Sequence, residues 1–508
     1  QGYDVHLDDL NCYGDLFALQ RKYFEQCMSY FPHWKFLNIF RNGPRYFVRH
    51  QLAFLQAAGK QNAAYHRLVS QILNFDGKSN FTDKAIDSLD GIISDIFNNV
   101  LSKTQQLVSQ IEPDVIGCTM LESTLPSALI ILKKAKEINH KIKTVLGGPG
   151  AIVGNVVDDG NLQDIIKKCN WIDAIIYGEG EKLFEKYLEG AWADKKIITV
   201  QDLKSLSSTQ GDSGLLLDLD SLPMPDYDRL PVQGYLWMSI HASRGCPFNC
   251  AFCFENCYWV RFRQKSPKRV ISEMNLLSER YKKNKFYICD SLANHIATQL
   301  SEGLLKESKK YFWDCYMRVT EDCLDIEKVS LWASGGLERA RIGVESASSR
   351  VLKMMNKGVL PEQTRKSLMN FAQSGIKTTT LWIAGFPGES EADFQESIDF
   401  LNDNINSLYQ ADIWEFICSP SLIPSSESGS EDFSTKAMYP EEFDDLLVIK
   451  YYDLKNGPSP EVRFERIRRF EENRLKLGIP NPYSIKELIS AHQRWVNLGH
   501  NRNESNFF

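Results

Sequence analysis

The amino-acid sequence predicts an α/β protein with two parallel sheets and a helical C-terminal extension. Short apolar segments that end near glycine or a small polar residue alternate with amphipathic segments, first over residues 1–195 and again over 236–430. Such alternation is typical of βαβ units and therefore of parallel sheets. We expect a doubly wound N-terminal domain (Rossmann- or flavodoxin-like), a partial (β/α)6 barrel, and helices without an evident site over 431–508.

Size and composition are those of a globular protein. The chain has 508 residues, 43% hydrophobic and 24% charged, with a formal net charge of −6. This balance lacks the basic surface that nucleic-acid binding needs, and the longest apolar runs are too short for a bilayer. We therefore expect neither nucleic acid nor membrane as a partner. The cysteines are mostly single, which indicates a reducing compartment, so we expect a cytoplasmic protein. Because the chain begins with Gln1, we expect a missing N-terminal segment.

The N-terminal domain is predicted from apolar segments with helices between them. The expected strands are residues 3–10, 114–119, 144–148 and 174–178, and the expected helices are 125–140 and 161–169. A helical, aromatic-rich insertion over about 13–110 follows the first strand. The pattern of strand and helix predicts a parallel sheet with helices packed against it.

A linker over 196–235 leads into the predicted barrel. Its end, PMPDYDRLP, has three prolines in nine residues, which exclude a regular helix or a central strand. The strands expected after it are residues 237–243, 286–289, 312–319, 339–344, 377–385 and 412–418. Helix ends lie between them, such as the cap Ser266 before Pro267, or Pro361 and Gly375 around another helix. In such barrels the chemistry takes place at the C-terminal strand ends.

The densest group of cysteines directly follows the first predicted barrel strand. Cys246, Cys250 and Cys253 have the spacing C-x3-C-x2-C, and Cys257 comes next. A disulfide cluster conflicts with a reducing compartment, and zinc would need four ligands, usually as two separated pairs. A ferredoxin-type cluster on four thiolates is a further alternative. Three thiolates would hold three irons of a [4Fe–4S] cube and leave the fourth iron open to a substrate.

The spacing C-x3-C-x-aromatic-C, with Phe252 as the aromatic residue, resembles the signature of the radical S-adenosylmethionine (SAM) enzymes. Segments 339–358 and 376–390 resemble the fourth and fifth strands of that family. The resemblance implies a [4Fe–4S] cluster on the three cysteines. It also implies SAM contacts: Phe252, Ile383 and Gly385 at the adenine, Glu345 and Ser346 at the ribose or methionyl part, and Asp290 and Arg318 at the amino and carboxylate groups. Many relatives carry Gly-Gly-Glu after the second strand, where this chain has CDSLAN.

A doubly wound domain ahead of such a barrel resembles the cobalamin-dependent radical SAM enzymes. The matching segments are DVIGCT (114–119), LGGPGA (146–151) and YGEGE (177–181). Ligands of open α/β sheets lie beyond the carboxyl ends of the strands. The resemblance implies that cobalamin is bound by Thr119, Gly147, Gly148, Gly178 and Glu179. The chain has no D-x-H-x-x-G motif, so cobalamin would lack a histidine lower ligand. The alternative is a flavodoxin-like domain that holds no ligand.

The resemblance implies a methyltransferase that acts on an unactivated carbon of a peptide or natural-product intermediate. In the family, the reduced cluster cleaves SAM, the resulting radical takes a hydrogen atom from the substrate, and methylcobalamin delivers the methyl group. We expect a small-molecule or peptide substrate and an external flavodoxin- or ferredoxin-like electron donor. Two alternatives stay open: cyclisation or ring rearrangement without net methyl transfer, and a non-catalytic iron–sulfur or zinc module.

Overall fold

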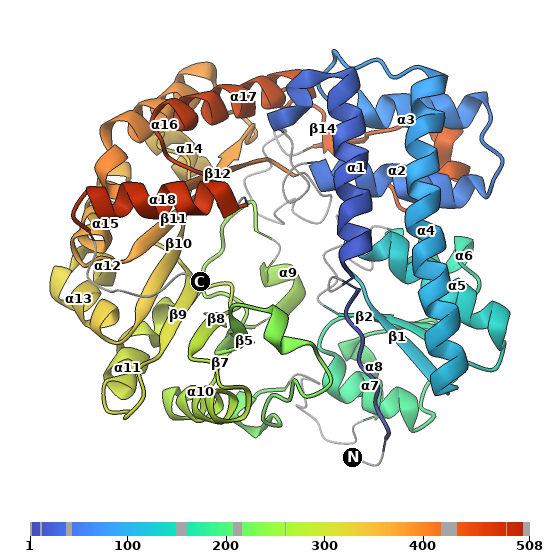
Figure 1. The fold of residues 1–508 in the computed structure, drawn as a ribbon, viewed down its shortest axis with the longest axis horizontal. Helices are drawn as coiled ribbons and strands as arrows, with labels where there is room; N and C mark the ends of the chain where they lie inside the picture. The colour runs from blue at the N-terminus through green and yellow to red at the C-terminus, as the bar shows by residue number, and fades with distance from the viewer. Residues whose placement is uncertain are drawn as a thin grey trace. The chain divides into compact units, whose positions relative to one another are not determined.

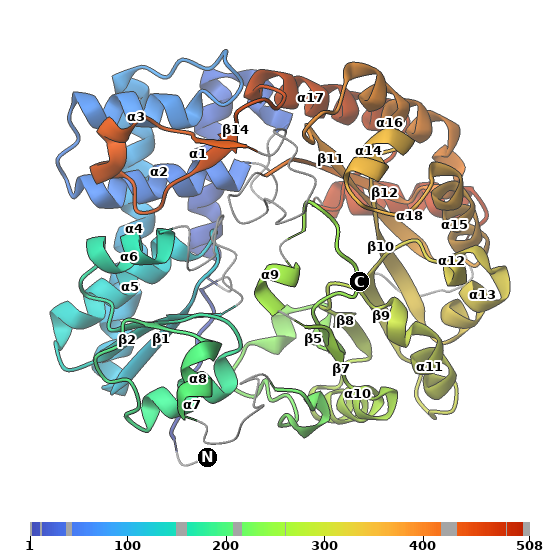
Figure 2. The same cartoon turned by 180° about the vertical axis from the view of Figure 1, so that it is seen from behind.

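The computed structural model describes residues 3–10, 13–36, 43–148, 160–206, 216–253, 255–259, 261–417, 434–483 and 485–500. The chain divides into two compact units (Figures 1 and 2). The N-terminal unit comprises residues 13–216 and 417–464, and the barrel unit comprises residues 1–12, 217–416 and 465–508. Each unit contains one larger parallel sheet, which confirms the expected fold class.

The sheet of the N-terminal unit has parallel strands in the order β1-β2-β3-β4. They are β1 (Val115–Thr119), β2 (Lys143–Gly147), β3 (Ala174–Ile176) and β4 (Ile197–Ile198). Helices α5 (Leu125–Ile138) and α6 (Asn161–Lys168) share a hydrophobic cluster with Leu146 and Ile175. Helices α7 (Gly180–Leu188) and α8 (Val200–Leu206) share another with Val145 and Ile176. Successive strand residues point to opposite faces, so helices cover both faces of this sheet.

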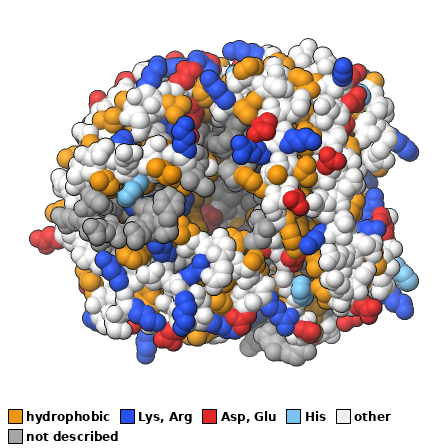
Figure 3. Space-filling view, viewed as in Figure 1, with side chains coloured by type: hydrophobic (Ala, Val, Ile, Leu, Met, Phe, Trp, Pro, Cys, Tyr) orange, Lys and Arg blue, Asp and Glu red, His pale blue; other side chains and the backbone are white. Residues whose placement is uncertain are grey.

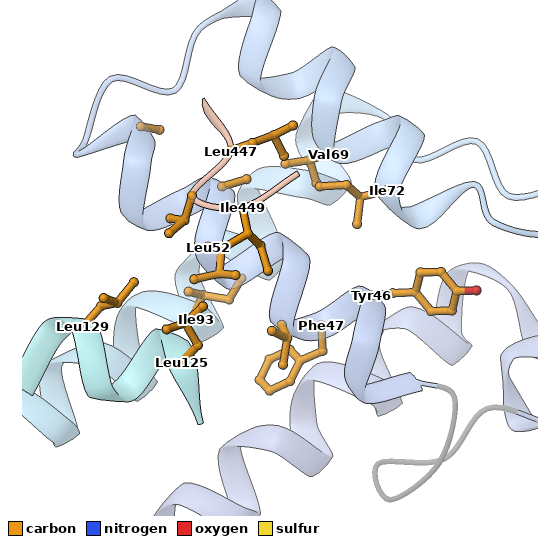
Figure 4. Close-up of a cluster of buried hydrophobic side chains, with 14 of the residues drawn as sticks. Tyr46, Phe47, Leu52, Val69, Ile72, Ile93, Leu125, Leu129, Leu447 and Ile449 are labelled. Carbon is orange, nitrogen blue, oxygen red and sulfur yellow. The ribbon is translucent and has the colours of Figure 1, made fainter. Parts of the chain in front are cut away.

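The helical insertion consists of α1 (Gly14–Tyr30), η2 (Pro32–Phe36), α2 (Gly43–Ala57), α3 (Ala63–Leu73) and α4 (Asp83–Ile111). The side chains of Asn62 and Thr82 accept backbone N–H groups at the starts of α3 and α4. Figure 4 shows the apolar core that these helices share with α5, where Phe47, Ile93 and Leu125 are buried. The insertion is therefore an integral part of the N-terminal unit.

A hairpin of β13 (Thr435–Ala437) and β14 (Tyr452–Leu454), with η9 (Glu441–Leu446) between its strands, also belongs to the N-terminal unit. Leu447 and Ile449 of this segment lie in the core of Figure 4. The expectation that all of 431–508 forms one helical extension is wrong here, because the apolar residues of the hairpin are buried against α2 and α3.

The barrel unit has six parallel strands in the order β12-β11-β10-β9-β8-β5. They are β5 (Met238–Ile240), β8 (Lys285–Ile288), β9 (Phe312–Met317), β10 (Leu337–Glu345), β11 (Lys377–Ala384) and β12 (Gln410–Glu415). All six expected strands are present. Strands β5 and β12 form the two edges, so the sheet is an open, partial barrel.

Helices cover the outer face of the barrel sheet (Figures 1 and 2). They are α10 (Pro267–Tyr281), α11 (Asn294–Leu304), α12 (Glu321–Leu324), α13 (Ile326–Ser334), α14 (Ser349–Met354), α15 (Pro361–Gln373) and α16 (Glu391–Asp403). The expected cap at Ser266 is confirmed, since its side chain accepts from the N–H of Arg269. The C-terminal helices α17 (Pro460–Lys476) and α18 (Ile485–Asn497) also pack on this unit through Phe470 and Trp495.

Two further sequence predictions about organisation are wrong. Residues 3–10 form no strand and belong to the barrel unit, because Val5 and Leu7 are about half exposed and no neighbouring strand pairs with them. The predicted linker is also too long at its start, because Ile197 and Ile198 are buried as β4 on opposite faces of the N-terminal sheet. None of the described helices is long and apolar enough to cross a membrane.

Candidate functional site

The cysteine loop follows β5 and is closed at its base by a short antiparallel ribbon. In this ribbon β6 (Ser243–Arg244) pairs with β7 (Arg263–Gln264). Gly245 follows β6 with φ +82°, and a Cβ there would lie 3.1 Å from the carbonyl oxygen of Arg261. Glycine is therefore required at this position both by the left-handed backbone and by the close approach of the returning chain. The ribbon places all three cysteines on one loop at the carboxyl end of the first barrel strand.

Cys246, Cys250 and Cys253 are free, partly exposed thiols. Burial raises the pKa of Cys253 to about 12, and the thiols of Cys250 and Cys246 add to this shift. Burial and the neighbouring Cys250 also raise the pKa of Cys246. The three groups thus lie close enough to influence one another, and metal binding must displace their protons. The side chain of Cys257 lies outside the described residues.

The spacing of the described cysteine side chains suits an iron–sulfur cluster better than a single metal ion. No three Cys, His, Asp or Glu side chains among the described residues are close enough to share one metal ion. A [4Fe–4S] cube does not need that convergence, because each thiolate binds a separate iron. Soft thiolate donors also suit iron–sulfur clusters.

Arg318, which follows β9, contacts the cysteine loop directly. Its Nη1 donates to the Sγ of Cys250 at 3.1 Å, and its Cζ lies 4.0 Å from the ring centroid of Phe248. The backbone of Arg318 is held on both sides by Asn294, which donates to its carbonyl at 2.8 Å and accepts from its N–H at 2.9 Å. This contact fixes the position of the Cys250 sulfur. The predicted contact of Arg318 with SAM stays a prediction.

Asp290, which follows β8, is buried and holds the start of the cysteine loop. Its Oδ1 accepts from the N–H of Ala242 at 2.8 Å, and its Oδ2 accepts from the hydroxyl of Ser243 at 2.6 Å. Burial raises the pKa of Asp290 to about 6. Both oxygens therefore serve the fold, and the predicted contact of Asp290 with SAM remains untested.

A segment after α14 holds the other side of the loop. The carbonyl of Met355 accepts from the N–H of Ala251 at 2.9 Å, and the side chain of Asn356 donates to the carbonyl of Asn249 at 2.8 Å. Lys357 Nζ lies 5.5 Å from the ring centroid of Phe252. Sequence reasoning used this MNKG segment for its resemblance but missed these contacts, which depend on the meeting of two distant loops.

Glu345, at the end of β10, has a left-handed backbone with φ +67°. Its carboxylate accepts from Lys357 Nζ at 2.7 Å in a buried ion pair. A Cβ on Gly343 would lie only 2.5 Å from Oε1 of Glu345, so this glycine makes room for the pair. The next residue, Ser346, is buried, and its hydroxyl accepts from the N–H of Ser348 at 3.1 Å. These contacts fix the strand end at which SAM binding is predicted.

The end of β11 carries the last two predicted SAM contacts, Ile383 and Gly385. Gly385 has φ +83°, and its N–H donates to Oε2 of Glu389 at 2.7 Å. Ile383 is partly exposed, unlike its buried neighbours Trp382 and Ala384. The cysteine loop, Arg318, Glu345 and Gly385 thus all stand at carboxyl ends of the same parallel sheet, where such barrels place their chemistry.

The N-terminal unit brings together the residues expected to bind cobalamin. Thr119 pairs with Gly147 across β1 and β2. Gly148 has φ +113°, and a Cβ there would lie 3.0 Å from Cγ2 of Thr119. Gly178, with φ +101°, has open space around its Cβ position among the described residues, and Glu179 directly precedes α7.

These residues occupy the carboxyl ends of β1, β2 and β3, where open α/β sheets bind ligands. The bare backbone at the three glycines suits a bulky corrin that must approach the chain closely. Residues 149–151 of the predicted LGGPGA segment lie outside the described residues.

Comparison with known proteins agrees with this geometry. A model of the radical SAM superfamily matches residues 240–401. An uncharacterized methyltransferase of Pyrococcus horikoshii is 27% identical over 61% of this chain and 68% of its own length. An anaerobic magnesium-protoporphyrin IX monomethyl ester cyclase of Rubrivivax gelatinosus is 26% identical over 63% of this chain and 60% of its own length. The hopanoid C-3 methylase of Methylococcus capsulatus is 27% identical over 58% of this chain and 59% of its own length.

The matched segment begins at the end of β5 and includes the cysteine loop and strands β8 to β11. The chain spans only about 60% of the length of two of these relatives. The resemblance inferred from the cysteine spacing is thus confirmed for the barrel, whose residues 240–401 match the radical SAM superfamily.

Proposed function

We propose that this protein is a cobalamin-dependent radical SAM methyltransferase that acts on an unactivated carbon of a peptide or natural-product intermediate. One observation carries the proposal: three free thiols on one loop at the carboxyl edge of an open six-stranded parallel sheet. The second α/β unit, with glycines at its strand ends, supports the cobalamin part. Two of the three relatives compared above are named for methyl transfer.

Cys246, Cys250 and Cys253 would hold the cluster, and the strand ends of the N-terminal unit would hold cobalamin. When bound, a reduced [4Fe–4S] cluster with an open iron supplies the electron that cleaves SAM, and cobalamin supplies the methyl group. The protein orients these groups. Arg318 fixes the sulfur of Cys250, and residues 355–357 hold the loop backbone from the opposite side.

The inner face of the barrel sheet offers a polar wall for a substrate. Arg341 makes a bidentate ion pair with Asp314, with Nε–Oδ1 at 3.0 Å and Nη2–Oδ2 at 2.7 Å. The Cζ of Arg341 lies 5.2 Å from the ring of Tyr287 and 5.7 Å from that of Tyr316. Their neighbours along the strands, such as Cys315 and Ile342, belong to the core on the other face. This wall supports a small-molecule or peptide substrate bound within the barrel.

The open cluster needs a source of electrons. We propose an external flavodoxin- or ferredoxin-like donor, and a reducing compartment such as the cytoplasm. On the face drawn in Figure 3, basic and acidic side chains are interspersed, without one large basic patch. We include neither nucleic acid nor membrane among the partners.

The test is anaerobic protein supplied with iron, sulfide, a strong reductant and candidate substrate. It is expected to convert SAM to 5′-deoxyadenosine, and added cobalamin is expected to change its visible spectrum on binding. Alanine at Cys246, Cys250 or Cys253 should abolish both the cluster and SAM cleavage. Cys289→Ala is the matched control, because that thiol lies outside the cysteine loop and donates to the carbonyl of Ile240 at 3.0 Å. Failure of the wild-type protein to cleave SAM with its substrate present refutes the proposal.

A second candidate is cyclisation or ring rearrangement with the same cofactors, favoured by the similarity to the cyclase. Product mass separates the two. A gain of one methylene supports methyl transfer, and an unchanged carbon skeleton supports the second candidate. Iron and sulfide analysis of Cys257→Ala tests the remaining alternative of an electron-transfer or zinc module, because a three-thiolate cluster survives that change.

A further inference from the structure

The loop after β11 is held by a buried carboxylate. Gly385 has a left-handed backbone with φ +83°, and its N–H donates to Oε2 of Glu389 at 2.7 Å. The side chain of Glu389 is 1% exposed. A charge-assisted hydrogen bond from a backbone amide restricts the orientation of that peptide. Gly385 is thus held by a side chain four residues further along.

The same carboxylate is held in turn by the C-terminal extension. Arg466 of α17 donates through Nη1 to Oε2 of Glu389 at 2.7 Å and through Nη2 to the carbonyl oxygen of Glu389 at 3.2 Å. Its side chain is 5% exposed, and its Cζ lies 5.6 Å from the ring of Phe394. One guanidinium therefore fixes both the side chain and the main chain of Glu389.

The buried pair of Arg466 and Glu389 is not needed simply to attach helix α17 to the barrel unit. A buried ion pair must recover the desolvation of both charges, and apolar residues of similar volume often stabilise a fold as well or better. Helix α17 already has apolar anchors on the barrel unit, Ile467 and Phe470. The ion pair therefore does something that apolar packing cannot, which is to direct a carboxylate oxygen at the N–H of Gly385.

We propose that Arg466 is a positioning residue for SAM: through Glu389 it fixes the peptide of Gly385 and with it the adenine end of the SAM site. The inference rests on the proposed function, which places SAM at this strand end. It gives the C-terminal extension, in which the sequence indicated no site, a part in SAM binding.

The experiment compares full-length, cluster-loaded variants. Arg466→Met removes the clamp. Arg466→Met with Glu389→Leu removes both charges, so no buried charge is left to unfold the protein. The matched control is Arg469→Met, which breaks a partly exposed ion pair between the same helix α17 and Glu391, the first residue of α16. Each variant is measured for iron content, thermal unfolding, SAM affinity from the change in the cluster EPR spectrum, and KM and kcat for SAM cleavage.

We expect SAM affinity to weaken roughly tenfold in both Arg466 variants, as for the loss of one charge-assisted hydrogen bond. KM for SAM should rise, while iron content and kcat at saturating SAM stay near wild type. The Arg469→Met control should bind SAM normally, and Arg466→Lys should recover part of the affinity. A folded double variant with wild-type affinity and KM overturns the inference. If the wild-type protein itself binds no SAM, the proposed function fails, and the inference fails with it. If wild type and double variant bind SAM equally well, only the inference about Arg466 fails.

Discussion

The guanidinium of Arg318 donates a hydrogen bond to the Sγ of Cys250 at 3.1 Å. This hydrogen bond fixes the position of a sulfur that is predicted to bind iron. Replacing Arg318 by methionine should therefore weaken cluster loading and lower SAM cleavage by about tenfold or more. Iron content and 5′-deoxyadenosine formation, measured anaerobically, check this. Arg365→Met, on the half-exposed surface of α15, is the control and should change neither. Normal loading and cleavage in Arg318→Met would show that Arg318 has no part in the site.

The buried pair of Glu345 and Lys357 joins the end of β10 to the segment after α14 at 2.7 Å, with side chains only 11% and 7% exposed. Lys357→Met leaves the Glu345 carboxylate buried without a cation. We expect a loss of about 3–5 kcal/mol in the free energy of unfolding, measured by urea denaturation. Lys328→Met breaks an exposed ion pair with Asp322 and should cause little change. Equal stability of Lys357→Met and Lys328→Met would contradict the stabilising role of the buried pair.

Gly245 is required at the base of the cysteine loop. Gly245→Ala forces a side chain into a backbone with φ +82°, with its Cβ 3.1 Å from the carbonyl of Arg261. A strained backbone of this kind costs about 1–3 kcal/mol, and here the strain falls on the cysteine loop. Iron and sulfide content after reconstitution should drop, whereas Gly234→Ala, which meets nothing within 4 Å among the described residues, should load normally.

The glycine after β3 offers a test of cobalamin binding that does not involve the cluster. Gly178 and Gly190 both have positive φ, +101° and +91°, and open space at the Cβ position among the described residues. Gly178 lies at the predicted cobalamin site, whereas Gly190 follows the C-terminal end of α7. Gly178→Val should lose cobalamin affinity, measured by equilibrium dialysis, while Gly190→Val should keep it. Similar losses in both variants would point to backbone strain alone.

Two buried carboxyl groups predict how stability depends on pH. Burial raises the pKa of Asp290 from 3.8 to about 6 and that of Glu389 from 4.5 to about 7. Both groups have a lower pKa in the unfolded chain than in the folded protein. At a pH between the unfolded and the folded pKa values, the folded state therefore binds more protons than the unfolded state. Their contribution to stability is therefore fully present below about pH 4 and is lost as the pH rises through about 6 and 7. Urea midpoints at pH 5 and pH 8 check this, and Asp290→Asn should reduce the difference.

Local sequence patterns carried most of the fold prediction. The alternation of apolar and amphipathic segments located all six barrel strands and β1 to β3, and the cap at Ser266 marked the start of α10. The spacing of Cys246, Cys250 and Cys253 indicated the cofactor class, because one short loop carries all three predicted ligands. The same reasoning failed at residues 3–10, where an apolar pattern has no core to be buried against.

The linear order of residues was therefore sufficient for the strands, the helix ends and the three-cysteine loop, since each depends on neighbours within a few positions. Only the folded chain reveals the groups that hold the loop and the strand ends in place. Arg318 meets Cys250 across 68 positions, and Arg466 meets Glu389 across 77. Local sequence patterns do not predict such pairs, because the packing of the sheet and of helix α17 brings these residues together.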